Sequence, residues 1–236
     1  MSENVQKPTA GSSVFLKSLI VVLLLVAIAA VVYRLYLVKP VPNDSKLAGL
    51  EKTLQDIRAA MNVDSVRQYN IQKVMKIISK YNQDLPSSVR YEIAEEIFDM
   101  SVKYTNLDVD LLCATITQES GATWSPEIVS ESGAMGLMQI MPTTAMWVAS
   151  YEGITWTSPE EILFNPIYNI RIGSRYLSAL IERYNLEGGL AAFNGGEKRA
   201  ALWLTNNKAD GTLSAETSNF LPRVLALYSE FKSMTL

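Results

Sequence analysis

An apolar segment near the N-terminus constrains this 236-residue chain most strongly. From Val14 to Val38 the chain is apolar apart from Lys17, Ser18 and Arg34. A helix of about 20 apolar residues spans the hydrocarbon core of a bilayer, and long basic side chains can reach the two interfaces from inside such a span. We therefore predict a transmembrane anchor over residues 14–38, preceded by a polar, disordered tail over residues 1–13.

A cleaved signal peptide is the alternative interpretation of the same segment. Small residues at Ala27 and Ala29 provide a plausible cleavage site. However, the apolar run continues past this site through Val32, which favours an anchor that is retained. The basic residues on the two sides of the segment do not settle its orientation.

Residues 39–85 follow the anchor and predict a linker and then an amphipathic helix. Pro40 and Pro42 end the apolar segment. Apolar residues then recur at alternating spacings of three and four, although Asp64 and Gln68 interrupt the pattern; they are Leu47, Leu50, Leu54, Ile57, Met61, Ile71, Met75 and Ile78. This apolar stripe fits a dimeric coiled coil along residues 45–80, or contact there with a protein of an envelope-spanning machine. It fits equally well an amphipathic helix that lies on the rest of the protein or on the membrane.

The stretch from Asp108 to Ala145 carries the most chemical information. Apolar residues at Val109, Leu112, Cys113 and Ile116 predict one buried helix face, which Asp108 or Asp110 can cap. Glu119 continues that face, and Gly121 ends the helix.

Glu119 therefore combines an apolar setting with a helix C-terminus. Burial disfavours a charged carboxylate, and so does the negative end of the helix dipole. A carboxyl group that keeps its proton near neutral pH suits the general acid of glycoside cleavage. The alternative is a partly exposed glutamate near a helix end, with no special role.

The composition removes several classes of function. The chain has no histidine and one cysteine, Cys113, which excludes histidine-based nucleophile pairs, HExxH zinc sites and an internal disulfide. We expect no cofactor and no metal. A formal net charge of −3 gives no basic surface for nucleic acid, so no nucleic-acid partner is expected. The catalytic groups that remain are carboxylates, hydroxyls and amides.

Several motifs in order resemble the Slt-type lytic transglycosylases, which have a goose-lysozyme-like domain and cut bacterial peptidoglycan. Glu119-Ser120 is followed by SESGAMGLMQIMPTTA at residues 130–145, which is similar to the family's SxxGAxGLMQxMPxTA. Asn165-Pro166 with Asn169-Ile170 resembles the family's NPxxNI, and AAFNGG at 191–196 resembles its AAYNAG. Glu216-Thr217 with Phe220 resembles ETxxY. The resemblance implies an all-α, lysozyme-like catalytic domain over residues 86–236.

The resemblance also implies roles for individual residues. Glu119 would be the catalytic acid. Ser130, Gln139 and Asn194 would hydrogen-bond to the glycan, while Met138, Phe193 and Phe220 would form apolar walls. Phe193 and Phe220 stand where the family has tyrosine. Glu216 is interpreted as a capping or structural carboxylate, and Glu127 and Glu131 as solvated surface charges.

The activity implied is cleavage of the β-1,4 bond between N-acetylmuramic acid and N-acetylglucosamine, with formation of a 1,6-anhydro product. It would serve cell-wall turnover or local opening of the wall. A hydrolytic lysozyme and a weakly active envelope-assembly or glycan-binding protein are the alternatives. The implied partners are peptidoglycan strands and the lipid bilayer. The expected location is the inner membrane, crossed once, with the catalytic domain on the periplasmic side.

Overall fold

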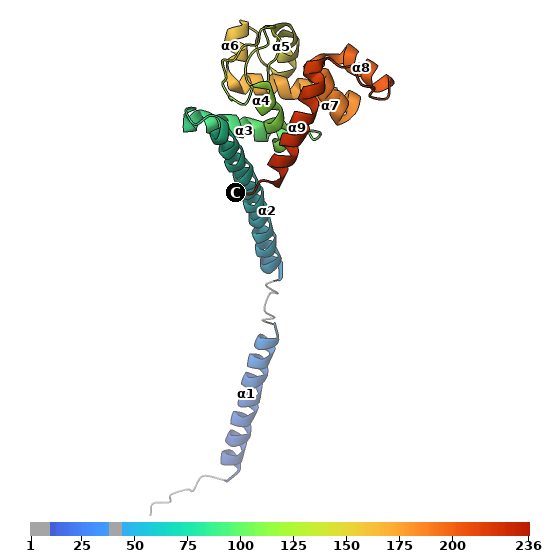
Figure 1. Cartoon of the computed structure of the whole chain (residues 1–236). Helices are drawn as coiled ribbons and strands as arrows, with labels where there is room; N and C mark the ends of the chain where they lie inside the picture. Colours follow the sequence, from blue (N-terminus) through green and yellow to red (C-terminus); the bar gives the residue numbers. More distant parts are fainter. Residues whose placement is uncertain (1–9, 38–43) are drawn as a thin grey trace, which may run out of the picture. The chain divides into compact units, whose positions relative to one another are not determined.

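The computed structural model describes residues 10–37 and 44–236, and Figure 1 shows its helices. The chain divides into two compact units, Met1–Ala60 and Met61–Leu236. The described residues form helices and loops, and their only β pairing is two isolated bridges within residues 129–140. The predicted all-α fold is confirmed.

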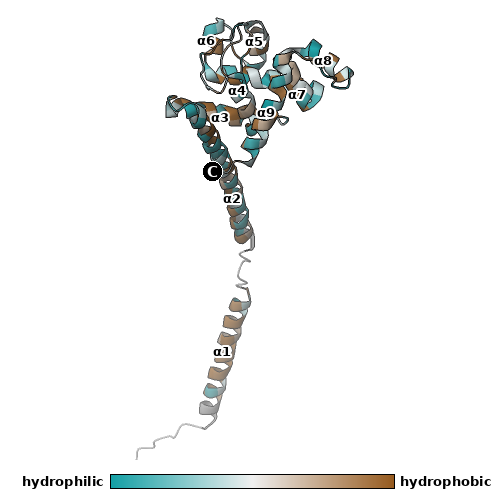
Figure 2. Ribbon diagram, in the orientation of Figure 1, coloured by the Kyte–Doolittle hydropathy of each residue, from teal (hydrophilic) through white to brown (hydrophobic). Residues whose placement is uncertain are grey.

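In the first unit, helix α1 (Ala10–Leu37) contains the predicted anchor. Its residues Phe15–Leu37 form a helix long and apolar enough to cross a membrane, and Figure 2 colours most of this helix as hydrophobic. Its side chains from Phe15 onward are exposed. The helix begins earlier than predicted, because residues 10–13, expected to be disordered, already belong to it. The rest of the predicted tail, residues 1–9, and most of the predicted linker lie outside the described residues.

Helix α2 (Asp44–Tyr81) belongs to the first unit up to Ala60 and to the second from Met61. Its later part is integral to the second unit's core, where Ile71, Val74, Ile77 and Ile78 are buried. The compact domain therefore begins earlier than the predicted boundary at residue 86. The last part of the apolar seam packs against the protein itself, whereas the apolar side chains from Leu47 to Met61 are exposed.

The rest of the second unit consists of α3 (Ser87–Lys103), α4 (Val109–Glu119), α5 (Pro142–Ala149), α6 (Pro159–Leu163), α7 (Pro166–Gly195), α8 (Glu197–Thr205) and α9 (Ala215–Ser233), with a 3-10 turn at Ser150–Glu152. Helix α7 changes direction at Asn185, where φ is 59°. The sequence pattern predicts a last helix over residues 221–231, and the structure starts this helix earlier, at Ala215.

Helix α4 lies at the centre of this unit (Figure 1). It packs against α9 and α3, and all of its residues from Leu111 to Thr117 are buried. Burying its apolar side chains contributes roughly 1.5–3 kcal/mol each relative to leaving them in water. Because the helix is surrounded for most of its length, its C-terminal residue is held in a fixed place.

Candidate active site

The sequence places Glu119 at the end of α4 through two local signals. Asp108 caps the start of the helix, and its Oδ1 accepts a hydrogen bond from the Leu111 amide at 2.8 Å. At the other end Gly121 adopts φ of 59°, and the Ala122 amide donates to the Thr117 carbonyl at 2.8 Å. The predicted helix, its cap and its end are therefore confirmed.

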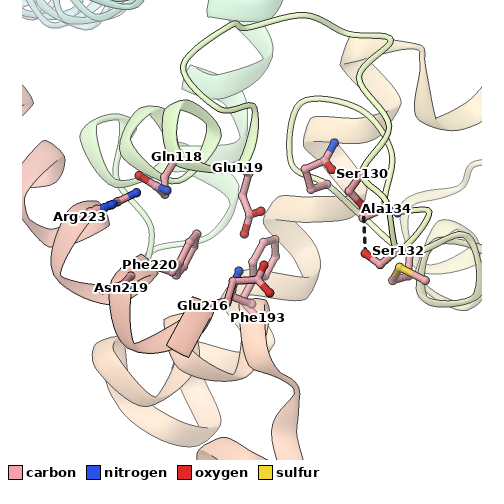
Figure 3. A pocket seen from close by; sticks show the side chains of 13 residues that line it. Gln118, Glu119, Ser130, Ser132, Ala134, Phe193, Glu216, Asn219, Phe220 and Arg223 are labelled. Atoms are coloured by element: carbon pink, nitrogen blue, oxygen red, sulfur yellow. Dashed lines mark hydrogen bonds between the residues drawn. The ribbon is translucent and has the colours of Figure 1, made fainter. Parts of the chain in front are cut away.

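A pocket of about 450 Å³ lies at this end of α4 (Figure 3). Three segments that are far apart in the sequence form its walls: the end of α4 with the following loop, the end of α7, and the start of α9. The lining residues are Gln118, Glu119, Ser130, Ser132, Ala134, Gln139, Met141, Phe193, Asn194, Glu216, Asn219, Phe220 and Arg223. Four amide and two hydroxyl side chains are among these thirteen residues, which suits a ligand with many hydroxyl groups.

Glu119 has an unusual electrostatic environment. Burial and, as the smaller cause, the nearby charge of Glu216 together raise the pKa of its carboxyl to about 8. Among the residues that the structure describes, no Lys or Arg forms an ion pair with Glu119. At neutral pH the group therefore holds its proton, while its side chain stays partly open to the pocket.

The loop between α4 and α5 presents Ser130 and Gln139 to the pocket. The Ser130 hydroxyl accepts a hydrogen bond from the Ala134 amide at 3.0 Å, and Nε2 of Gln139 donates to the Gly136 carbonyl at 2.8 Å. Gln139 adopts φ of 48°, a left-handed conformation that is uncommon outside glycine. These contacts fix both side chains before any ligand arrives.

Asn169 of α7 fixes the loop between α4 and α5 by hydrogen bonds to its backbone. Its side chain is fully buried, and its Oδ1 accepts from the Met138 amide at 2.8 Å. Its Nδ2 donates to the carbonyls of Met135 and Leu163, at 2.9 and 3.0 Å. Gly136 adopts φ of 77° directly against this side chain, and a Cβ there would collide with it.

Met138 is the one predicted site residue that the structure does not place in the pocket. Its side chain is fully buried and packs against Gly173 of α7, so it belongs to the core. The prediction that it forms a wall of the sugar site is wrong. Its neighbour Gln139 points the other way, into the pocket, because the loop turns at that residue.

The remaining predicted residues do line the pocket: Ser130, Gln139, Phe193, Asn194 and Phe220. Phe193 packs against Tyr176, with ring centroids 5.6 Å apart. The side-chain oxygen of Asn194 is buried and has no hydrogen-bond partner within the protein. A buried acceptor without a partner is uncommon in folded proteins. The binding roles of these residues remain predictions.

Glu216 corrects the sequence analysis. Ser214, not Glu216, caps α9: its hydroxyl accepts from the Thr217 amide at 3.1 Å. Glu216 instead lines the pocket together with Glu119, and Figure 3 shows both side chains directed into it. Glu127 and Glu131 are exposed and do not line this pocket. Gln118, Asn219 and Arg223 also line the pocket, although they belong to none of the sequence motifs. They lie there because α4 and α9 turn these faces toward the pocket.

Comparisons with known proteins agree with this arrangement. The family model of the transglycosylase SLT domain matches residues 96–214. The soluble lytic murein transglycosylase of Escherichia coli K12 is 32% identical over 141 residues, which cover 54% of this chain and 22% of that protein. The membrane-bound lytic murein transglycosylase C of Photorhabdus laumondii is 30% identical over 153 residues, covering 52% of this chain and 42% of that protein.

Among solved structures, an inactive mutant of the lytic transglycosylase Slt from Pseudomonas aeruginosa superposes with a TM-score of 0.52 at 28% identity. The match covers 58% of this chain and 23% of that protein, and it supports the lysozyme-like fold. The chain spans about a fifth of the length of the first curated relatives it matches. The family model covers half of the chain, including Glu119 and its loop, so the chain belongs to the transglycosylase SLT domain family.

Proposed function

We propose that this protein is a lytic transglycosylase that cuts peptidoglycan glycan strands at the β-1,4 bond between N-acetylmuramic acid and N-acetylglucosamine. One observation carries the proposal: a carboxyl group with a pKa of about 8 opens into a pocket lined by amides and hydroxyls. A protonated carboxylic acid at neutral pH is the group that glycosidic bond cleavage requires. The names of the relatives support the same substrate class.

In the first step, Glu119 donates its proton to the bridging glycosidic oxygen. The bond from that oxygen to C1 of the muramoyl residue breaks, and the electron pair leaves with the oxygen. An oxocarbenium-like centre develops at C1, as in other glycoside-cleaving enzymes. The charge of Glu216 favours the protonated form of Glu119 before this step, because a second anion in the same pocket is disfavoured.

In the second step, the Glu119 carboxylate accepts the proton of the muramoyl 6-hydroxyl. The oxygen of that hydroxyl bonds to C1 and closes a 1,6-anhydro ring. The proton returns to Glu119, no water is consumed, and the enzyme regains its starting state. One carboxyl group thus serves as acid and then as base, which makes a second catalytic carboxylate unnecessary.

A hydrolytic muramidase is the second candidate, and a specific observation favours it. Glu216 shares the pocket with Glu119, and glycoside hydrolases use two carboxyl groups that flank the scissile bond. Mass spectrometry of the products released from purified peptidoglycan separates the two activities. We expect products that end in an anhydro-muramoyl residue, whereas products heavier by one water would establish hydrolysis.

We also propose that α1 anchors the protein once in the inner membrane, with the catalytic domain on the periplasmic side, where it would serve wall turnover or local opening of the wall. The support is the length and apolar character of Phe15–Leu37, together with relatives that are named membrane-bound. Protease accessibility in spheroplasts tests it: cleavage of the catalytic domain from outside is expected, and protection would contradict the orientation.

Apolar side chains in the first part of α2 are exposed, and this exposure favours a protein partner that covers them. Leu47, Leu50, Leu54 and Ile57 are all about half exposed or more, and a second copy of the chain would cover them in a parallel coiled coil. Apolar side chains remain exposed as far as Val66 and become buried from Ile71, so we propose the contact for the part of residues 45–80 that precedes Ile71. Sedimentation in detergent would show a dimer, and a monomer at micromolar concentration would contradict this.

A further inference from the structure

Helix α5 and the 3-10 turn that follows it carry an exposed pair of aromatic side chains. Trp147 is 64% exposed and Tyr151 is 55% exposed, whereas the other three tryptophans of the chain are buried or half-buried. The two rings pack edge to face, with centroids 5.3 Å apart. The guanidinium of Arg175 on α7 lies 5.3 Å from the centre of the Tyr151 ring. These contacts hold the rings in place and still leave most of the indole in water, as expected of a surface that binds a ligand.

This aromatic pair lies on the helix that leads away from the catalytic pocket. Met141, the residue before α5, lines that pocket. A smaller cavity of about 220 Å³ shares Met141 and Gln139 with the catalytic pocket and adds Thr144 of α5 and Tyr176 of α7. Thr144 and Trp147 are three residues apart on α5 and are therefore neighbours on its surface. Trp147 lies roughly 9 Å further along the helix than Met141, which is about the length of a disaccharide.

The groups around the Trp147 ring suit a sugar. The flat face of an indole can pack against the face of a pyranose ring that carries C–H groups, while hydroxyls beside the indole bond to the sugar's edge. Thr143 is exposed and lies one helical turn before Trp147. The hydroxyl of Ser150, also exposed, donates to the Trp147 carbonyl at 3.2 Å and can still accept a hydrogen bond. The ring is thus flanked by hydroxyl groups on the solvent side of α5.

The size of this surface argues against a protein partner. The exposed apolar side chains on α5 and the following turn are Met146, Trp147 and Tyr151, and the exposed Thr143 and Ser150 interrupt them. A stable protein interface buries roughly 800 Å² on each partner and uses about 20–30 residues. A few side chains divided by hydroxyl groups fall short of such an interface. They match the area of one or two sugar rings.

We propose that Trp147 and Tyr151 form a platform that binds the glycan strand outside the catalytic pocket, a few sugars away from the bond that is cut. The inference rests on the proposed function, because it takes the ligand of the platform to be the strand that also fills the pocket. A strand cut at Glu119 would pass Thr144 and stack a sugar on the Trp147 ring. Since a long strand is then held at two places, the protein would bind long strands more tightly than short fragments.

Binding to intact sacculi tests the platform without any cleavage. The full chain carrying Glu119→Gln, in detergent micelles, is sedimented with purified sacculi. Adding Trp147→Ala should raise the apparent Kd about tenfold, a usual loss when a tryptophan at the centre of a contact is truncated. Leu202→Ala is the matched control, since Leu202 is an exposed apolar residue of α8 that lines neither the catalytic pocket nor the smaller cavity, and it should leave the Kd unchanged. Equal affinities of the Trp147→Ala and Leu202→Ala proteins would overturn the inference.

Two further substitutions distinguish stacking on a sugar from a general apolar contact. Trp147→Phe keeps an aromatic ring, so its Kd for sacculi should stay within about threefold of the parent protein. Trp147→Leu is apolar but has no ring, and we expect it to bind as weakly as Trp147→Ala. If Trp147→Leu binds as well as Trp147→Phe, the surface contacts lipid or protein rather than sugar rings, and the inference is wrong.

Activity on substrates of different length separates this inference from the proposed function. With Glu119 intact, Trp147→Ala should lower kcat/KM about tenfold more on long purified strands than on tetrasaccharide fragments, because only a long strand reaches the platform. If Trp147→Ala weakens binding to sacculi but Glu119→Gln still cuts at the normal rate, the platform stands and the catalytic assignment fails. If cleavage needs Glu119 but Trp147→Ala changes neither the binding nor the length preference, the platform fails alone.

Discussion

Two acidic side chains at opposite ends of α4 show how surroundings decide the role of a carboxyl group. Asp110 lies in the first turn, and its Oδ1 is 2.7 Å from Nζ of Lys73 on α2. Glu119 is the last residue of the helix, and no cation among the described residues pairs with it. Asp110 stands at the positive end of the helix dipole and is paired with a lysine, whereas Glu119 is buried at the negative end, and both of its conditions disfavour an anion. The first carboxyl group is structural, and the second is available for proton transfer.

The largest effect that this comparison predicts is on catalysis. Glu119→Gln removes the proton donor, so we expect the release of soluble products from purified peptidoglycan to fall by at least about 10³-fold. Glu127→Gln is the matched control, because Glu127 is an exposed loop residue outside the pocket, and its activity should match the unaltered protein. Turnover by Glu119→Gln at the control's rate would end the catalytic assignment.

At the start of α4, removing the partner of Asp110 should lower the stability of the folded protein. Lys73→Met leaves Asp110 without its cation in a site where the two side chains are only 6% and 15% exposed. We expect the free energy of unfolding to fall by about 3–5 kcal/mol, as measured by urea denaturation followed by tryptophan fluorescence. The double variant Lys73→Met/Asp110→Leu should recover most of that loss. A loss under about 1 kcal/mol would show that this pair does not tie α2 to the domain.

Glu119 should also make the stability of the folded protein depend on pH. Its folded pKa of about 8 lies above the ordinary value of 4.5, so between these values the folded state binds more protons than the unfolded state. Stability is therefore highest below the lower value and decreases as the pH rises through the window, by up to about 1.4 kcal/mol per pH unit. Glu119→Gln lacks this dependence. The difference in Tm between Glu119→Gln and the unaltered protein should grow across the window, and a constant difference would contradict the pKa.

The smallest predicted effect concerns Glu216. Because its charge raises the pKa of Glu119, Glu216→Gln should shift the alkaline limb of the kcat/KM profile to lower pH. The shift should be smaller than the part of the pKa rise that is due to burial, since burial is the larger cause. Glu131→Gln, an exposed loop variant, serves as the control. Loss of all activity in Glu216→Gln would instead favour the hydrolytic mechanism with two carboxyl groups.

The residues that the sequence located correctly share one property: their environment is local. The apolar stripe of α4, the cap at Asp108 and the turn at Gly121 all act within a few residues of Glu119. Periodicity therefore placed this helix and its final carboxyl group, and the motif resemblance brought Phe193 and Asn194 to the same pocket.

The residues that were misplaced depend on tertiary packing. An apolar seam on α2 looks the same whether it covers a second chain or its own domain, so the burial of Ile71 and Ile78 could not be predicted. An acid near a helix start resembles a cap, and only the placement of α9 beside α4 brings Glu216 into the pocket. Met138 turned inward because Asn169 fixes the loop from a helix 31 residues away.

The most direct test of the central claim is a titration of the Glu119 carboxyl itself. Carbon-13 NMR of the full chain labelled at the glutamate side-chain carboxyl would identify its signal as the one missing from Glu119→Gln. The account predicts a midpoint at about pH 8, with the signal of a protonated carboxyl group at neutral pH. A midpoint at the ordinary value of 4.5 would mean that Glu119 is ionised at neutral pH and cannot be the proton donor.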